Sequence, residues 1–174
     1  LQVDVNLKVA GGTLTDLLGK LITRWGSVCQ QIKTTYPELR VIPYAHGDTT
    51  TAFGVTTASF AHGFPSVHVE AGIRTYMIRK EVLDQAYKGT SRQDFDFKQW
   101  FGVSSDLSNY ALGSHEPFPE QWNTRATEAG TGLFMTPVPL ATENILKEGF
   151  PADRVFEVGN TVVDAMSFVE MKEE

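Results

Sequence analysis

Two short polar segments carry the side chains best suited to chemistry. The first reads HGDTTT at 46–51 and follows the run 40–45, and the second reads HVEAGIRT at 68–75 and follows the apolar run 64–67. In each, the run leads into an acid close to a glycine. The carboxyl ends of parallel strands deliver such groups to the ligand cleft of open α/β folds. The acids Asp48 and Glu70 therefore predict acid–base chemistry on a small molecule.

The same residues allow other interpretations. Asp48 precedes a predicted helix and can serve as its N-cap. His46 and His68 are residues of the kind that bind divalent ions, but their spacing matches no metal motif, and we expect no metal. The sequence contains no Walker P-loop, no Gly-x-Gly-x-x-Gly and no Gly-x-Ser-x-Gly. It therefore gives no support to a nucleoside triphosphatase, a Rossmann dehydrogenase or a serine hydrolase.

The segments that must position these residues alternate between strand and helix patterns. Thr13 and Asp16 predict a capping box at the start of an amphipathic helix that Pro37 ends. We expect strands at 1–7, 40–45, 66–70, 133–135 and 155–158, and further helices at 50–62, 119–130, 140–148 and 162–172. The strand–helix–strand succession implies right-handed crossovers. The predicted fold class is α/β, a parallel Rossmann-like sheet with helices on both faces.

The segment 76–118 interrupts this alternation and predicts an insertion. Its part 77–87 fits a short helix, and five large apolar residues follow between Phe95 and Val103. Long segments without strand signals often form lids above ligand clefts. A self-packed excursion with no role in chemistry explains the pattern equally well, so both interpretations stay open.

Composition limits the class of protein. A length of 174 residues suits a single domain, 1–174, or one domain of a larger protein. The formal charge of −6 argues against a nucleic-acid surface. The single cysteine, Cys29, is expected to be a buried free thiol, which fits a reducing cytoplasm. The sequence has no apolar run of about 20 residues and no signal peptide, so we expect no membrane contact and a cytoplasmic location.

Five ordered blocks resemble the signatures of the non-hydrolysing UDP-N-acetylglucosamine 2-epimerases. They are HGDTTT at 46–51, HVEAGIRT at 68–75, FPEQWNTR at 118–125, LATENILKEG at 140–149 and VGNTVVD at 158–164. The resemblance implies one half of a two-domain GT-B architecture, of the N-terminal type. It also implies that an opening strand and its loop precede Leu1, and that a C-terminal nucleotide-binding domain with a catalytic His follows Glu174; both are absent from this sequence.

The resemblance implies interconversion of UDP-GlcNAc and UDP-ManNAc by anti elimination and re-addition of UDP, without a metal or other cofactor. The implied catalytic acids are Asp48, Glu70 and Glu120. The substrate-binding residues predicted with them are His46, Asp48, Thr49, Glu70, Arg74 and Asn123. The chain departs from the family pattern Pro-Glu-Glu-x-Asn-Arg at Gln121 and Thr124, and its segment 76–118 is longer than the family's.

Three functions follow as hypotheses. The first is an incomplete part of a sugar-nucleotide 2-epimerase, inactive alone, whose partners are a UDP-sugar and the missing domain. The second is half of a GT-B glycosyltransferase or of a hydrolysing epimerase, with the same scaffold but a different outcome. A glycosyltransferase has no need to deprotonate C2 of the sugar, so the acid pair favours the epimerase over it. The third is a non-catalytic sugar-nucleotide-binding or interaction domain, which Gln121 and the long segment 76–118 would support. The sequence leaves homodimer formation open.

Overall fold

A four-stranded parallel sheet forms the centre of the molecule. The computed structural model describes residues 5–9, 11–88, 96–113 and 116–169. The strands lie in the order β1-β2-β5-β6, all parallel, with bounds β1 (Tyr44–His46), β2 (Val67–Val69), β5 (Leu133–Thr136) and β6 (Val155–Glu157). The predicted parallel α/β fold is therefore confirmed. Strand β1 is shorter than the strand predicted at 40–45, because pairing with β2 begins only at Tyr44.

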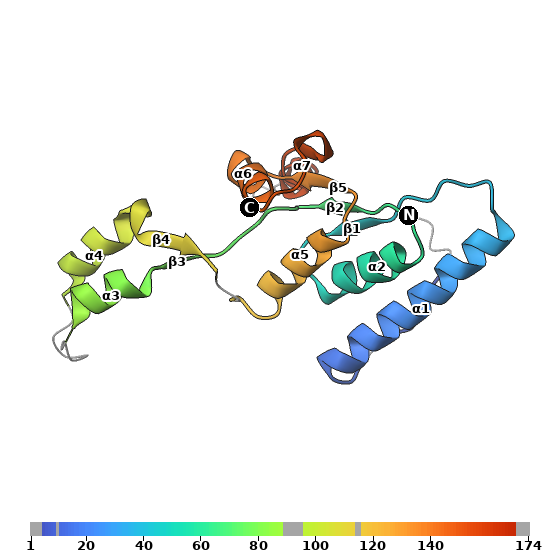
Figure 1. Cartoon of the computed structure of the whole chain (residues 1–174), viewed down its shortest axis with the longest axis horizontal. Helices are drawn as coiled ribbons and strands as arrows, with labels where there is room; N and C mark the ends of the chain where they lie inside the picture. The colour runs from blue at the N-terminus through green and yellow to red at the C-terminus, as the bar shows by residue number, and fades with distance from the viewer. Residues whose placement is uncertain (1–4, 10, 89–95, 114–115, 170–174) are drawn as a thin grey trace, which may run out of the picture.

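Helices cover both faces of this sheet, as predicted (Figure 1). On one face lie α1 (Leu14–Thr35), α2 (Thr50–Ala61) and α5 (Glu120–Ala129); on the other lie α6 (Pro139–Lys147) and α7 (Thr161–Ser167). The helix α2 is rich in small residues, which lets it approach α1 closely. A Cβ atom at Gly54 would lie 2.9 Å from the Cβ of Leu21. This helix could therefore not carry larger residues on that face.

The beginning of α1 follows the predicted capping box. The Thr13 hydroxyl accepts from the backbone N–H of Asp16, and the Asp16 carboxylate accepts from the backbone N–H of Thr13. Further along this helix, the Trp25 indole donates to the Ser59 hydroxyl of α2 at 2.8 Å. These bonds fix the start of α1 and its alignment with α2.

The elements predicted at the two ends of the chain, a strand at 1–7 and a helix at 162–172, differ from the structure within the described residues. The strand expected at 1–7 falls partly outside the described residues, and 5–9 has no strand structure. Its carbonyls at Leu7 and Lys8 accept instead from the Arg24 guanidinium. The last helix ends at Ser167 rather than 172, and Phe168 and Val169, which follow it, are not helical. Residues 170–172 lie outside the described part.

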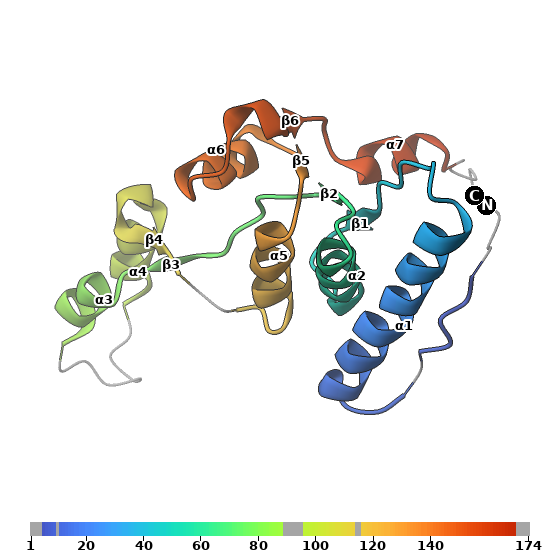
Figure 2. The same cartoon turned by 45° about the vertical axis from the view of Figure 1, so that its right-hand side comes forward.

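The described part of the segment 76–118 packs mainly on itself. Strand β3 (Tyr76–Ile78) pairs antiparallel with β4 (Tyr110–Leu112), and α3 (Lys80–Tyr87) and α4 (Phe97–Ser105) lie between them in the chain. This unit extends away from the sheet instead of covering it (Figures 1 and 2). The structure therefore favours the self-packed excursion over the lid. The helix predicted at 77–87 is replaced by β3 and α3, since the start of that segment pairs with β4.

Candidate functional site

The two predicted acids follow neighbouring strands and meet at one edge of the sheet. His46, the last residue of β1, is in register with Val69, the last of β2. The ladder continues beyond them, because the N–H of Gly47 donates to the carbonyl of Val69 at 2.9 Å. The Glu70 carboxylate then lies 3.6 Å from Nε2 of His46. Asp48 and Glu70 therefore belong to the same C-terminal edge.

Gly47 allows this close approach. Its φ is +73°, and a Cβ atom there would lie 3.6 Å from Oε2 of Glu70. A Cβ at that distance makes an ordinary van der Waals contact, so the positive φ is the main reason for glycine here. The glycine thus gives the backbone a left-handed turn beside the acid.

Thr49, rather than Asp48, caps the helix that follows. The Thr49 hydroxyl accepts from the N–H of Ala52 at 3.1 Å. Asp48 is half-buried, and within the described residues its carboxylate has no hydrogen bond or ion pair. The capping interpretation of Asp48 is therefore wrong, and its carboxylate is available to a ligand.

Glu70 has an unusual backbone conformation for a residue with a side chain. Its φ is +66°. Residues other than glycine rarely adopt this region, and such strain is typical of functional sites. The following N–H, that of Ala71, donates to the carbonyl of Met135 at 3.0 Å. The unfavourable backbone conformation thus occurs at Glu70 itself, between the end of β2 and Ala71, which is hydrogen-bonded to β5.

The predicted substrate-binding residue Arg74 lies in a buried ion cluster. Its side chain is 1% exposed and pairs with Glu128 and Glu148, the latter at 2.7 Å. Burial disfavours the charged guanidinium, but hydrogen bonds to Glu148 and Glu128 outweigh this effect and raise the pKa of Arg74. The hydrogen bond from Arg74 lowers the pKa of Glu148 in turn. In this structure Arg74 therefore holds elements together, and direct contact with a substrate stays a prediction.

His68 is fully buried beneath the same edge. Its Nε2 lies 2.8 Å from the carbonyl of Gly47 and donates to it, since a carbonyl can only accept. Its Nδ1 lies 3.7 Å from Oε1 of Glu128. Burial lowers the pKa of His68. In the described residues no group of three or more His, Cys, Asp and Glu could hold a metal ion.

Glu120 and Asn123 lie in the first turn of α5, which begins at the same edge of the sheet as α2. Asn123 is buried, and its Nδ2 donates to the Thr50 hydroxyl in the first turn of α2 at 3.3 Å. This bond joins the two helix starts. Glu120 is half-buried, and in the described part of the chain it has no hydrogen bond or ion pair with Asp48 or Glu70.

Sequence reasoning missed three residues around the site. Nε2 of His46 lies 3.3 Å from the Thr161 hydroxyl at the start of α7. The only sequence signal for Thr161 is its place in the family block at 158–164. Gln121 accepts from the N–H of Thr75 at 3.1 Å. Glu128 accepts from the N–H of Gly72 at 2.7 Å, and nothing in the sequence marks it among other helical acids.

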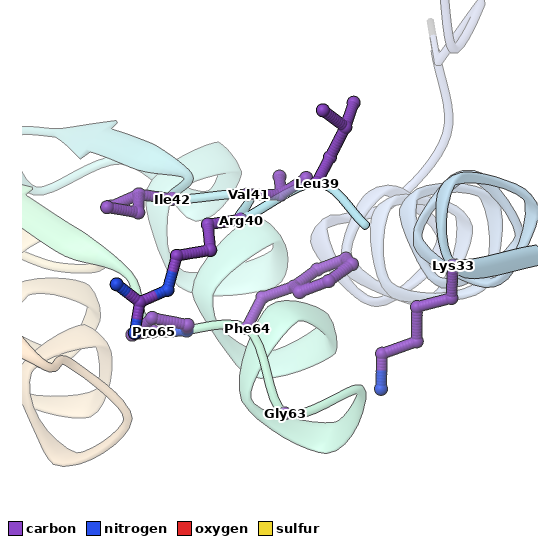
Figure 3. A pocket seen from close by; sticks show the side chains of 8 residues that line it. All are labelled: Lys33, Leu39, Arg40, Val41, Ile42, Gly63, Phe64 and Pro65. Carbon is purple, nitrogen blue, oxygen red and sulfur yellow. The ribbon is translucent and has the colours of Figure 1, made fainter. Parts of the chain in front are cut away.

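A cavity of about 490 Å³ lies elsewhere on the domain (Figure 3). Its walls include residues 39–42, which lead into β1, and 63–65, which lead into β2. It therefore opens at the N-terminal edge of the sheet, whereas the acids follow the C-terminal ends. Its Lys33 ammonium lies 5.4 Å from the centre of the Phe64 ring. This cavity is not part of the acid site.

The fold and the site together define an α/β domain that presents carboxylates at a strand edge. A family model described as UDP-N-acetylglucosamine 2-epimerase matches residues 1–89 and 112–174. The chain belongs to this family.

Individual relatives agree with the family match. A UDP-N-acetylglucosamine 2-epimerase of Bacillus subtilis is 29% identical over 164 residues, which are 94% of this chain and 32% of that protein. A crystal structure of UDP-GlcNAc 2-epimerase from Neisseria meningitidis bound to UDP-GlcNAc matches with a TM-score of 0.66 and 25% identity, over 96% of this chain and 35% of that one. A co-structure of S. aureus MnaA with UDP matches with a TM-score of 0.64 and 26% identity, over 95% of this chain and 33% of that one.

The chain spans about a third of the length of the relatives it matches. The family match leaves out residues 90–111, inside the excursion. In the described residues, no helix combines the length and apolar character that crossing a membrane requires.

Proposed function

We propose that this chain is the N-terminal catalytic part of an enzyme that interconverts UDP-GlcNAc and UDP-ManNAc. The family match over most of the chain supports the reaction. The approach of Glu70 to His46 at the end of β1, next to Asp48, supports the location of the chemistry and is the structural observation that carries the proposal.

The reaction explains why the site needs more than one acid. The C2 proton of the sugar is weakly acidic, so a positioned carboxylate must remove it. Elimination of UDP then gives a glycal, and UDP adds back after a proton returns to the opposite face of C2. In this proposal Asp48, Glu70 and Glu120 supply the proton-transferring groups.

The remaining predicted residues orient the substrate around these acids. The His46 side chain is 56% exposed, so it can donate to a bound ligand while it stays near Glu70. Thr49 lies beside Asp48 at the start of α2 and is also exposed. Arg74 and Asn123 act here mainly by fixing the loop and the helix starts, as their buried hydrogen bonds indicate. The family architecture implies that most uridine contacts come from a second domain.

The test is C2 proton exchange by the full-length protein that contains this chain. Incubation with UDP-GlcNAc in deuterated water should place deuterium at C2 and produce UDP-ManNAc, both visible by NMR. Free sugar in place of UDP-ManNAc would indicate a hydrolysing enzyme. Binding of UDP-GlcNAc without C2 exchange would instead favour the non-catalytic sugar-nucleotide domain and contradict the proposal.

A further inference from the structure

The loop 70–75, which carries Glu70, is held by side chains from two helices. Glu128 of α5 accepts from the N–H of Gly72 at 2.7 Å, and Asn144 of α6 donates to the carbonyl of Gly72 at 2.9 Å. Both backbone polar groups of one residue are thus satisfied by side chains distant in sequence. Such bonds fix the path of the loop two residues after the acid.

Packing restricts the same residue. The φ of Gly72 is +84°, and a Cβ atom there would lie 2.2 Å from the carbonyl oxygen of Ala141. The loop therefore lies against α6 with no room for a side chain. A shift of Gly72 would move Glu70 as well, since Ala71 alone separates them.

Glu128 is the residue on which most of these contacts converge. Its side chain is 1% exposed. Besides Gly72, its oxygens accept from both terminal nitrogens of Arg74, and Arg74 also pairs with Glu148. A carboxylate buried away from water needs such hydrogen-bond donors to offset the cost of its desolvation. Glu128 therefore ties the backbone of the loop and its buried cation to α5.

We propose that Glu128 is a positioning residue for Glu70. Its carboxylate holds Gly72 and Arg74 so that the loop keeps Glu70 in its left-handed conformation, with the acid at the end of β1 beside His46. Glu128 itself touches neither substrate nor reacting atoms in this scheme. The inference rests on the proposed function for its effect on turnover, but the positioning itself has a readout without turnover.

The first experiment compares Glu128→Gln with Glu143→Gln in the full-length protein. Glu143 is an exposed acid on α6 whose partner is Lys147 one turn away, so it is a matched control. Small displacements of a catalytic group reduce turnover strongly. Glu128→Gln should lower kcat per folded molecule by about 10-fold or more while KM changes less than about twofold. Equal kcat in the two variants would overturn the proposal.

A double-mutant cycle separates positioning from general loss of structure. If Glu128 acts through Glu70, Glu128→Gln should have little further effect in a Glu70→Gln background. Full additivity of the two losses would mean that Glu128 acts elsewhere, and the proposal would fail.

A conservative variant covers the case in which Glu128→Gln does not fold. Glu128→Asp keeps the charge for Arg74 but withdraws the carboxylate from Gly72 by one methylene. It should fold, lose turnover in the same direction, and exchange the Gly72 amide with solvent at least about 10-fold faster than the wild type. Unchanged amide exchange would overturn the positioning role even if the wild type showed no epimerase activity. Absence of C2 exchange in the wild type would instead overturn the proposed function alone.

Discussion

A proton-transferring carboxylate, the role proposed for Glu70, must be held in place, and the contacts that fix Glu70 act mainly on its backbone. Its φ of +66° aims the side chain toward the end of β1. Maintaining such a conformation costs on the order of 1–3 kcal/mol, which surrounding contacts must offset. The bonds to Ala71 and Gly72 are such contacts. Asp48, in contrast, is free to respond to a ligand.

Removal of either acid should lower turnover far more than it lowers substrate affinity. We expect Asp48→Asn and Glu70→Gln each to lower kcat of the full-length protein by about 10²–10⁴-fold, with a smaller change in substrate affinity, because acid–base groups contribute in this range. Steady-state kinetics and calorimetric binding of UDP-GlcNAc measure the two effects. Near-normal turnover in both variants would remove these residues from the mechanism.

The place of a site residue in the fold could be predicted where neighbouring residues in the sequence indicate it. The polar segments at 46–51 and 68–75 directly follow strands, so their location at one edge followed from the alternation of strands and helices. The orientation of Arg74 was not predictable, because its partners Glu128 and Glu148 lie 54 and 74 residues away in the chain. A buried ion pair of this kind leaves no local pattern in the sequence.

At the scale of elements, the start of α2 decides between two interpretations of the HGDTTT segment. Thr49 is the N-cap, so Thr49→Ala should lower the free energy of unfolding by about 1 kcal/mol. Asp48→Asn should change it by less than about 0.5 kcal/mol, as is usual for residues without such a role. Urea denaturation of the two variants measures both values. A larger loss for Asp48→Asn than for Thr49→Ala would restore the capping role to Asp48.

Helices and strands were predicted correctly where the sequence signal lies within a few residues, and wrongly where a strand pairs with a segment distant in the sequence. The capping box at Thr13 and the small residues of α2 are signals within a few residues. The helix predicted from residue 77 is wrong at β3, because the partner strand β4 begins at Tyr110, 34 residues after Tyr76, the first residue of β3, and each strand is only three residues long.

For the whole molecule, the buried groups predict loss of stability in acid. Burial lowers the pKa of His68 below the ordinary 6.5, so the unfolded chain binds more protons between the two values. Stability is therefore full above about pH 6.5 and falls as the pH drops through this window. The hydrogen bond from Arg74 lowers the pKa of Glu148 below 4.5, which adds a second loss below that pH.

A variant at His68 tests the first of these losses. His68→Gln can still donate to the carbonyl of Gly47 but does not titrate, so it should flatten the dependence of unfolding free energy on pH just below pH 6.5. Chemical denaturation at a series of pH values gives this slope. An unchanged slope in the variant would assign the acid sensitivity to other groups.

The last prediction concerns the 174-residue chain by itself. We expect it to bind UDP-GlcNAc weakly or not at all and to show no C2 exchange. The chain spans about a third of its relatives, and their two-domain architecture implies a cleft whose closure positions the sugar and excludes water. In the isolated chain no second domain would enclose the site of Asp48 and Glu70 or hold the nucleotide.

Calorimetric titration with UDP-GlcNAc and NMR of C2 exchange in deuterated water, on the chain and on the full-length protein side by side, measure this difference. Heat denaturation of the isolated chain must show a cooperative transition, so that absence of binding reflects the missing wall rather than an unfolded sample. In the proposed mechanism the acid pair alone does not suffice, since removal of the C2 proton and departure of the diphosphate both require the sugar to be fixed in one orientation. Exchange by the isolated chain at a rate near that of the full-length protein would mean that this edge of the sheet contains a complete base and substrate site. The second domain would then serve affinity rather than catalysis.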